Sequence, residues 1–150
     1  MNTFYDIVKV IKDELHSSPF VNTVTYGEIG DVDLNQTTVY PLSHFITDNV
    51  QVGEKVLLYS ISVMSMDVIA EDSDEENPLG FSGNEEDIYN TQLNVLTKLI
   101  QVLKKGSLAR TGYKLENEPT VSPFKDRFKD VVAGWETTLT IKIINGMPVC

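Results

Sequence analysis

The sequence has little of what enzymes and secreted domains use for chemistry and cross-linking. It contains one cysteine, Cys150, and two histidines, His16 and His44, in 150 residues. A single cysteine has no partner within the chain, which excludes an internal disulfide framework and favours a reducing compartment. Because a terminal thiol lacks a positioned base, we interpret Cys150 as incidental rather than catalytic.

Long apolar runs are also missing. No stretch approaches the roughly 20 apolar residues of a membrane-spanning helix, and the first residues show no basic region followed by an apolar one. We therefore expect a protein that is soluble and intracellular when made. With 150 residues, of which 41% are hydrophobic and 23% charged, the chain is expected to form one globular domain with its own core.

Basic residues are scarce and unevenly placed. The chain has 12 Lys and Arg against 22 Asp and Glu, a net charge of -10. Residues 1–97 carry a net charge of -14, whereas residues 98–150 carry +4. The overall acidity argues against tight binding to nucleic acid phosphates. The asymmetry is explained either by a solvated acidic surface beside a basic helix end and loop, or by self-complementarity between copies in a head-to-tail ring.

Apolar periodicity predicts two helices. The first has one apolar stripe and ends near residues 17–19; the stripe comprises Phe4, Ile7, Val8, Ile11 and Leu15. The second starts after Asn84 with three acidic residues and ends with Lys104 and Lys105, so each end suits the helix dipole. Its broad stripe predicts packing on a sheet, and a coiled-coil partner helix is disfavoured because no heptad is sustained.

The remaining periodic segments predict strands. Val56–Ala70 has largely apolar or small residues on both alternating sides, so we expect a central strand with something covering each face. Shorter strands are expected within residues 20–26 and 39–46, where Pro41 favours an edge position or a bulge. The segment 106–123 lacks clear periodicity and is expected to be a long loop or arm.

The chain closes with a strand that has one wet face, because Leu139, Ile141 and Ile143 alternate with polar residues. Trp135 stands directly after Gly134, at what we take as the head of this strand. We interpret this tryptophan as a core anchor; an exposed partner-binding residue is the alternative.

Two acidic stretches have the initial spacing of a calcium-binding loop. The first fails because Gln36 stands where glycine is required and Leu42 where the bidentate glutamate belongs. The second fails in the same way, with Asn77 and Gly83 at those positions. The stretches begin with Asp31, Asp33 and Asn35, and with Asp72, Asp74 and Glu76. We therefore predict no metal-binding residues.

Catalytic signals are equally weak. Asp67 lies near the carboxyl end of the central strand, where functional carboxylates often sit, but it has no acid or histidine at a defined spacing. His16 and His44 lie in segments without a serine or cysteine partner motif. We therefore predict no catalytic or cofactor-binding residues and no cofactor.

The order of these elements carries a resemblance. The segments are YPLSHF at 40–45, LLYSISVMSMDVI at 57–69, an acidic break, EEDIYNTQLNVLTKLIQVL at 85–103 and AGWETTLTIKI at 133–143. In this order the chain resembles the tail terminator, or tail-completion, proteins of long-tailed bacteriophages. The resemblance covers most of the chain at the level of pattern, except residues 20–50. It implies one small α+β domain over residues 1–150, with two amphipathic helices packed on one side of a mixed, mainly antiparallel sheet.

The resemblance also implies a function. Proteins of that family are structural virion proteins rather than enzymes; they form a ring, commonly a hexamer, that caps the tail tube, ends tail elongation and joins the tail to the head. The implied partners are other copies of the chain, the tail tube protein and a head-completion or connector protein, and DNA passes through without specific binding. The implied location is the virion tail, with the host cytoplasm during assembly and no membrane.

Two groups of charged residues acquire roles from the resemblance. An acidic loop would face the lumen of the ring and repel DNA phosphates; it comprises Glu71, Asp72, Asp74, Glu75 and Glu76. Without the resemblance, the default interpretation of this loop is a solvated tip. A basic group would contact the neighbouring subunit; it comprises Lys104, Lys105, Arg110 and Lys114. The alternatives from other classes are a non-enzymatic acidic adaptor or assembly chaperone, and a small hydrolase.

Overall fold

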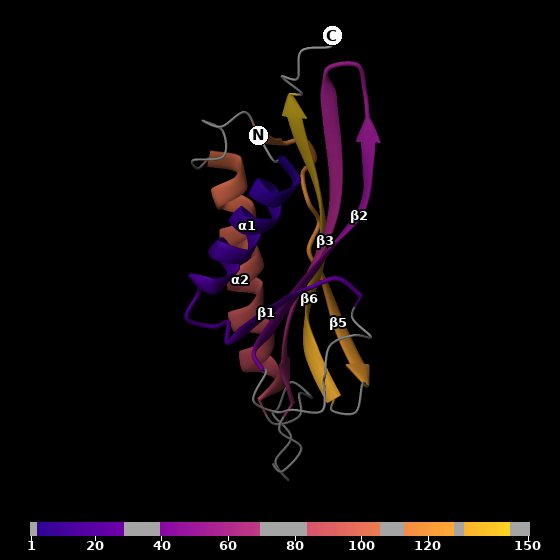
Figure 1. Cartoon of the computed structure of the whole chain (residues 1–150). Coiled ribbons are helices and arrows are strands. Elements are labelled where there is room, and N and C mark those ends of the chain that lie inside the picture. Colours follow the sequence, from indigo (N-terminus) through magenta and orange to yellow (C-terminus); the bar gives the residue numbers. More distant parts are fainter. Residues whose placement is uncertain (1–2, 29–39, 70–83, 106–112, 128–130, 145–150) are drawn as a thin grey trace.

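Two helices lie on one face of a six-stranded sheet in the part of the chain that the structure describes (Figure 1). The structure is a computed structural model and describes residues 3–28, 40–69, 84–105, 113–127 and 131–144. The sheet is mostly antiparallel, so the chain has the small α+β fold that the sequence predicts. The elements are α1 (Thr3–His16), β1 (Thr23–Tyr26), β2 (Leu42–Val52), β3 (Val56–Val68), α2 (Glu85–Lys105), β4 (Tyr113–Leu115), β5 (Ser122–Arg127) and β6 (Val131–Ile144).

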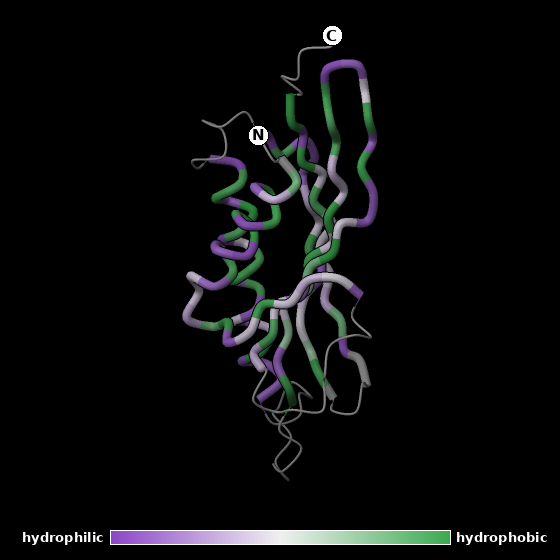
Figure 2. The backbone as a smooth tube through the Cα atoms, viewed as in Figure 1, coloured by the Kyte–Doolittle hydropathy of each residue, from purple (hydrophilic) through white to green (hydrophobic). Residues whose placement is uncertain are grey.

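The helices form where their sequences predict. In α1, Ile7, Ile11 and Leu15 are at most 2% exposed, while Phe4, at the start of the predicted stripe, is 40% exposed. In α2 the stripe is buried against the sheet, and the backbone oxygen of Asn84 accepts the first hydrogen bond, from Ile88. In Figure 2 apolar and polar residues alternate along both helices, as expected of helices with one face on a core.

β3 is the central strand of the sheet, as its sequence predicts. It pairs antiparallel with β2 on one side and with β6 along its whole length on the other. Tyr59, Ile61 and Val63 point towards the helices and are at most 4% exposed. Both helices lie on the same face (Figure 1), so among the described residues no helix covers the opposite face, where Met66 is buried in a second apolar cluster with Tyr40, Leu42 and Val132. On the opposite face Ser60 and Ser62 are only half-buried.

β2 differs from its prediction. Pro41, which follows a cis peptide bond, precedes the first residue of the strand, so it removes no hydrogen bond from the sheet. The start of β2 is not at an edge, because β1 pairs with it in parallel from Leu42 to Phe45. A bulge is present, but it lies further along, between Thr47 and Asn49.

The segment 106–123, predicted as a loop, contains sheet structure. β4 and the start of β5 fall within it, and both strands pair antiparallel with β6, at opposite ends of that strand. Three residues such as Tyr113–Leu115 are too few to show a sequence period, which is why periodicity misses this strand. Residues 106–112 lie outside the described part of the chain.

β3 and β6 approach each other closely at Gly134, since a Cβ there would lie 2.0 Å from the backbone oxygen of Ser65. Gly134 and Trp135 lie inside β6 rather than at its head. The Trp135 indole donates a hydrogen bond to the backbone oxygen of Tyr89 over 2.8 Å, and the two rings meet edge to face. Trp135 therefore anchors the sheet to α2, which confirms its interpretation as an anchor.

Candidate functional site

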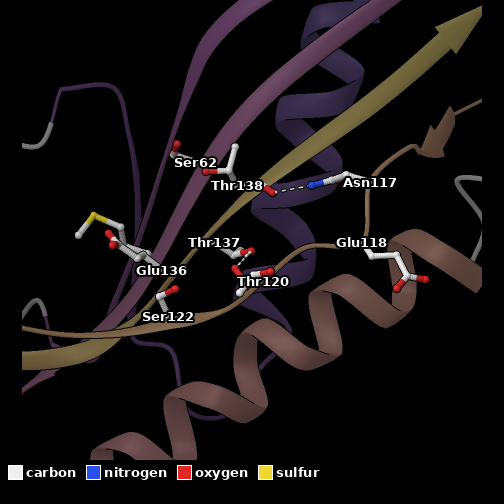
Figure 3. Close-up of a pocket in the computed structure, with 9 residues that line it drawn as sticks. Ser62, Asn117, Glu118, Thr120, Ser122, Glu136, Thr137 and Thr138 are labelled. Carbon is white, nitrogen blue, oxygen red and sulfur yellow. Dashed lines mark hydrogen bonds between the residues drawn. The ribbon is translucent and has the colours of Figure 1, made fainter.

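The sheet face away from the helices carries a hydroxyl-rich cavity. Its volume is about 500 Å³, and Figure 3 shows its lining residues. They come from β3, β6, the segment between β4 and β5, and the first residue of β5: Ser62, Met64, Asn117, Glu118, Thr120, Ser122, Glu136, Thr137 and Thr138. Among the described lining residues, Glu118 and Glu136 are the charged members, and none is a lysine, arginine or histidine.

The cavity forms because β4 and β5 pair with different ends of β6, and the segment that joins them runs alongside its middle. Asn117 holds this segment in place: its side-chain amide donates to the Thr138 oxygen over 3.1 Å, and its side-chain oxygen accepts from the Thr140 amide over 2.9 Å. The side chain thus substitutes for a strand residue. A further bond of 3.0 Å runs from the Thr137 hydroxyl to the Thr120 backbone oxygen (Figure 3).

The chemistry of this cavity does not suit hydrolysis. A serine nucleophile needs a base whose pKa lies near the working pH, oriented by a third group. The Ser62 hydroxyl donates instead to the exposed Asp48 carboxylate over 2.5 Å, and the described residues that line the cavity include no histidine or lysine. Hydroxyls and carboxylates without a cation also offer no attraction to a phosphate. The surface is suited to solvated polar contacts.

His44 is a structural residue. It is 2% exposed, and both ring nitrogens are engaged: Nε2 lies 2.6 Å from the Gly27 backbone oxygen, and Nδ1 lies 2.7 Å from the Thr25 hydroxyl. A neutral ring that donates from Nε2 and accepts at Nδ1 satisfies both bonds. Burial lowers the pKa of His44, against the raising effects of the Gly27 bond and of Glu28. The ring therefore joins β1 to β2 and leaves no nitrogen to act as a base.

Asp67, the lone candidate carboxylate, has no catalytic arrangement around it in the described residues. It pairs with Ala133 across the sheet, and its Oδ1 accepts a bond of 2.8 Å from the amide of the next residue, Val68. Burial raises the pKa of Asp67 more than this bond lowers it. A search of the described residues also finds no group of His, Cys, Asp and Glu side chains that fits a metal ion.

A buried polar chain at the centre of the fold escaped the sequence analysis. The Ser65 hydroxyl donates to the Gln92 side chain over 2.5 Å, and the Ser43 and Ser65 hydroxyls lie 3.0 Å apart. The Gln92 amide reaches the Phe20 backbone oxygen at 3.4 Å. These hydrogen bonds fix the position of α2 over β3 and β2, because buried polar groups must find partners. The signal in the sequence is a glutamine within the apolar stripe of α2.

Three of the four predicted interface lysines and arginines can be placed. Lys104 and Lys105 end α2, and Lys114 lies in β4, opposite Lys142 of β6. The Lys104 ammonium lies 3.8 Å from the Glu118 carboxylate of the same chain, and both side chains are exposed. Arg110 and the whole predicted acidic loop, Glu71, Asp72, Asp74, Glu75 and Glu76, lie outside the described residues.

No protein-family model matches the chain, and no curated protein sequence matches it either. Neither helix of the described residues is long and apolar enough to span a membrane.

Proposed function

We propose that this protein is a structural, non-enzymatic virion protein of a long-tailed bacteriophage. It forms a hexameric ring that caps the tail tube, ends tail elongation and joins the tail to the head. The observation that carries the proposal is the agreement between the fold and the resemblance: both amphipathic helices pack on one face of a mixed, mainly antiparallel sheet, in the expected order. Likeness in fold and in element order supports this role.

The surface chemistry is compatible with this role. The cavity on the open sheet face presents hydroxyls and carboxylates, and the chain as a whole carries a net charge of -10. DNA phosphates are repelled by such a surface, so DNA can move past it without sticking. In this proposal the ring contacts the tail tube protein and a head-completion or connector protein, and it needs no cofactor.

The composition of finished particles separates this proposal from the acidic adaptor or assembly chaperone. A ring subunit stays in the virion, so quantitative mass spectrometry of purified particles is expected to find a fixed number of copies per tail, equal to the ring order. An adaptor leaves after assembly. Particles that contain the tube and connector proteins but lack this chain contradict the proposal and favour the adaptor.

A further inference from the structure

β2 is longer than the strand that pairs with its outer edge. β1 pairs with Leu42–Phe45, so among the described residues the outer edge of β2 from Ile46 to Val52 has no strand beside it. An open edge of this kind presents unpaired backbone groups and is a template for another strand.

The backbone groups that face this open edge belong to Val50 and Val52. The Gly53 amide donates to the Val56 oxygen over 2.8 Å, so Gly53 directs its polar groups towards β3. Hydrogen-bonded and non-hydrogen-bonded pairs alternate in an antiparallel ladder. The backbone N–H and C=O groups of Gln51 therefore also point towards β3, whereas those of Val50 and Val52 point away from β3, towards the open edge. Their side chains are 39% and 74% exposed.

The opposite edge of the sheet has the same pattern. The Glu116 amide donates to the Thr140 oxygen over 2.8 Å, which directs Glu116 and Lys114 towards β6. By the same alternation, Tyr113 and Leu115 of β4 direct their backbone polar groups outwards. No strand pairs with this outer edge of β4 in the described residues.

The open edges of β2 and β4 are in register with each other across the sheet. One row of paired residues runs Val52, Leu57, Ile143 and Tyr113, and a second runs Val50, Tyr59, Ile141 and Leu115. Both rows face the helices, and their members on β3, β6 and β4 belong to or pack against the core. Each row therefore ends in an exposed valine at one edge and in a buried Tyr113 or Leu115 at the other.

We propose that the β2 edge of one copy pairs antiparallel with the β4 edge of the next copy, so that the sheet continues from subunit to subunit. This inference rests on the proposed ring and assigns its interface. Val52 lies opposite Tyr113 and Val50 opposite Leu115, with four backbone hydrogen bonds between their outward-facing groups. The apolar rows then continue across the junction and cover the two exposed valines.

The remaining contacts agree with this register. Lys114 lies opposite Gln51 of the next copy, and Glu116 lies opposite Asn49, so no like charges oppose each other. A slip by one residue would turn the valines to the polar face. Because the two edges differ, the contact is heterologous and repeats head to tail, as a ring requires.

A disulfide between copies tests this register. Gln51 and Lys114 form a non-hydrogen-bonded pair in the proposed junction, with Cα atoms about 4.5 Å apart, which suits a disulfide. Within one chain β3 and β6 lie between them, a separation of roughly 14 Å at the usual strand spacing. The variant carries Gln51→Cys and Lys114→Cys together with Cys150→Ser, and is oxidised with diamide over a range of protein concentrations.

We expect a ladder of dimers, trimers and larger species that ends at the ring order. A mixture of the two single-cysteine variants should stop at dimers. The register control, Asn49→Cys with Lys114→Cys, places the Cα atoms roughly 7 Å apart or more and should cross-link severalfold less. Monomer at every concentration, or equal ladders from both registers, overturns the proposed interface.

Proline at the edge provides a second measurement. Val52→Pro removes an outward amide while leaving every bond between β2 and β3, so it should lower the yield of the ladder severalfold; Val52→Thr keeps the amide and should not. Equal yields from these two variants contradict strand pairing.

The interface and the phage role can fail separately. If the cysteine variant forms the cross-linked ladder but depletion of the protein leaves phage tails normal, the phage role is overturned and the interface stands. If the protein forms a ring in the virion but the cysteine variant does not cross-link, the interface is overturned and the phage role stands.

Discussion

At the scale of single residues, Asp67 carries a carboxylate that burial makes harder to ionise. Its pKa in the folded state is raised, whereas an unfolded carboxylate titrates near about 3.9. Between these two pKa values the folded state binds more protons than the unfolded state, so stability falls as pH rises through this window. At neutral pH, above the unfolded pKa, the burial of Asp67 therefore lowers the free energy of unfolding relative to acid pH.

Asp67→Asn is expected to stabilise the protein at pH 7. The amide carries no charge to desolvate, and its oxygen can still accept the hydrogen bond from the Val68 amide. Urea unfolding should show a higher midpoint for the variant at pH 7, and the difference should shrink below about pH 4. The control Asp13→Asn, on the exposed face of α1, should change stability by less than about 0.5 kcal/mol. A variant that is less stable than the parent at pH 7 contradicts this reading of Asp67.

At the scale of elements, the connection between β4 and β5 depends on one side chain. Asn117 bonds to both Thr138 and Thr140 of β6, where otherwise a strand residue would pair. Asn117→Ala leaves these two backbone groups without their partners and should cost about 1–3 kcal/mol of unfolding free energy.

The matched control for this loss is Asn117→Asp. An aspartate keeps the oxygen that accepts from the Thr140 amide and loses only the donor to Thr138, so its stability should fall between those of the parent and the alanine variant. Urea unfolding measures both changes, and hydrogen exchange at the Thr140 amide locates them. Exchange there that is no faster in the alanine variant than in the parent would show that Asn117 does not hold the segment.

The sequence predicted the elements whose apolar pattern repeats over many residues. It missed the elements that form only through contacts between residues distant in sequence. Both helices and the central strand repeat their apolar pattern over many residues, so their place in the fold follows from burial. β4 has three residues and is a strand only because β6 offers it an edge. The polar chain through Gln92 and the bridge by Asn117 depend on residues that are distant in sequence, and single-sequence patterns carry no such pairing.

At the scale of the whole molecule, the open edges and the charge asymmetry give the same expectation of head-to-tail contacts. Lys104, Lys105 and Lys114, the described members of the predicted basic group, lie at the end of α2 and on β4, next to one of the two edges. The hairpin between β2 and β3, whose tip is hydrophilic in Figure 2, carries the other edge. Two unlike edges on opposite sides of one subunit are the requirement for a ring.

The most direct measurement of the proposed function is the shape of the particles made without this protein. The gene is depleted in the phage that encodes it, and the lysate is examined by negative-stain electron microscopy, with the protein supplied from a plasmid as control. We expect headless tails of irregular, overgrown length beside filled heads without tails, and normal particles in the control. Tails of normal length joined to heads in the depleted lysate would contradict the terminator function and favour a soluble adaptor.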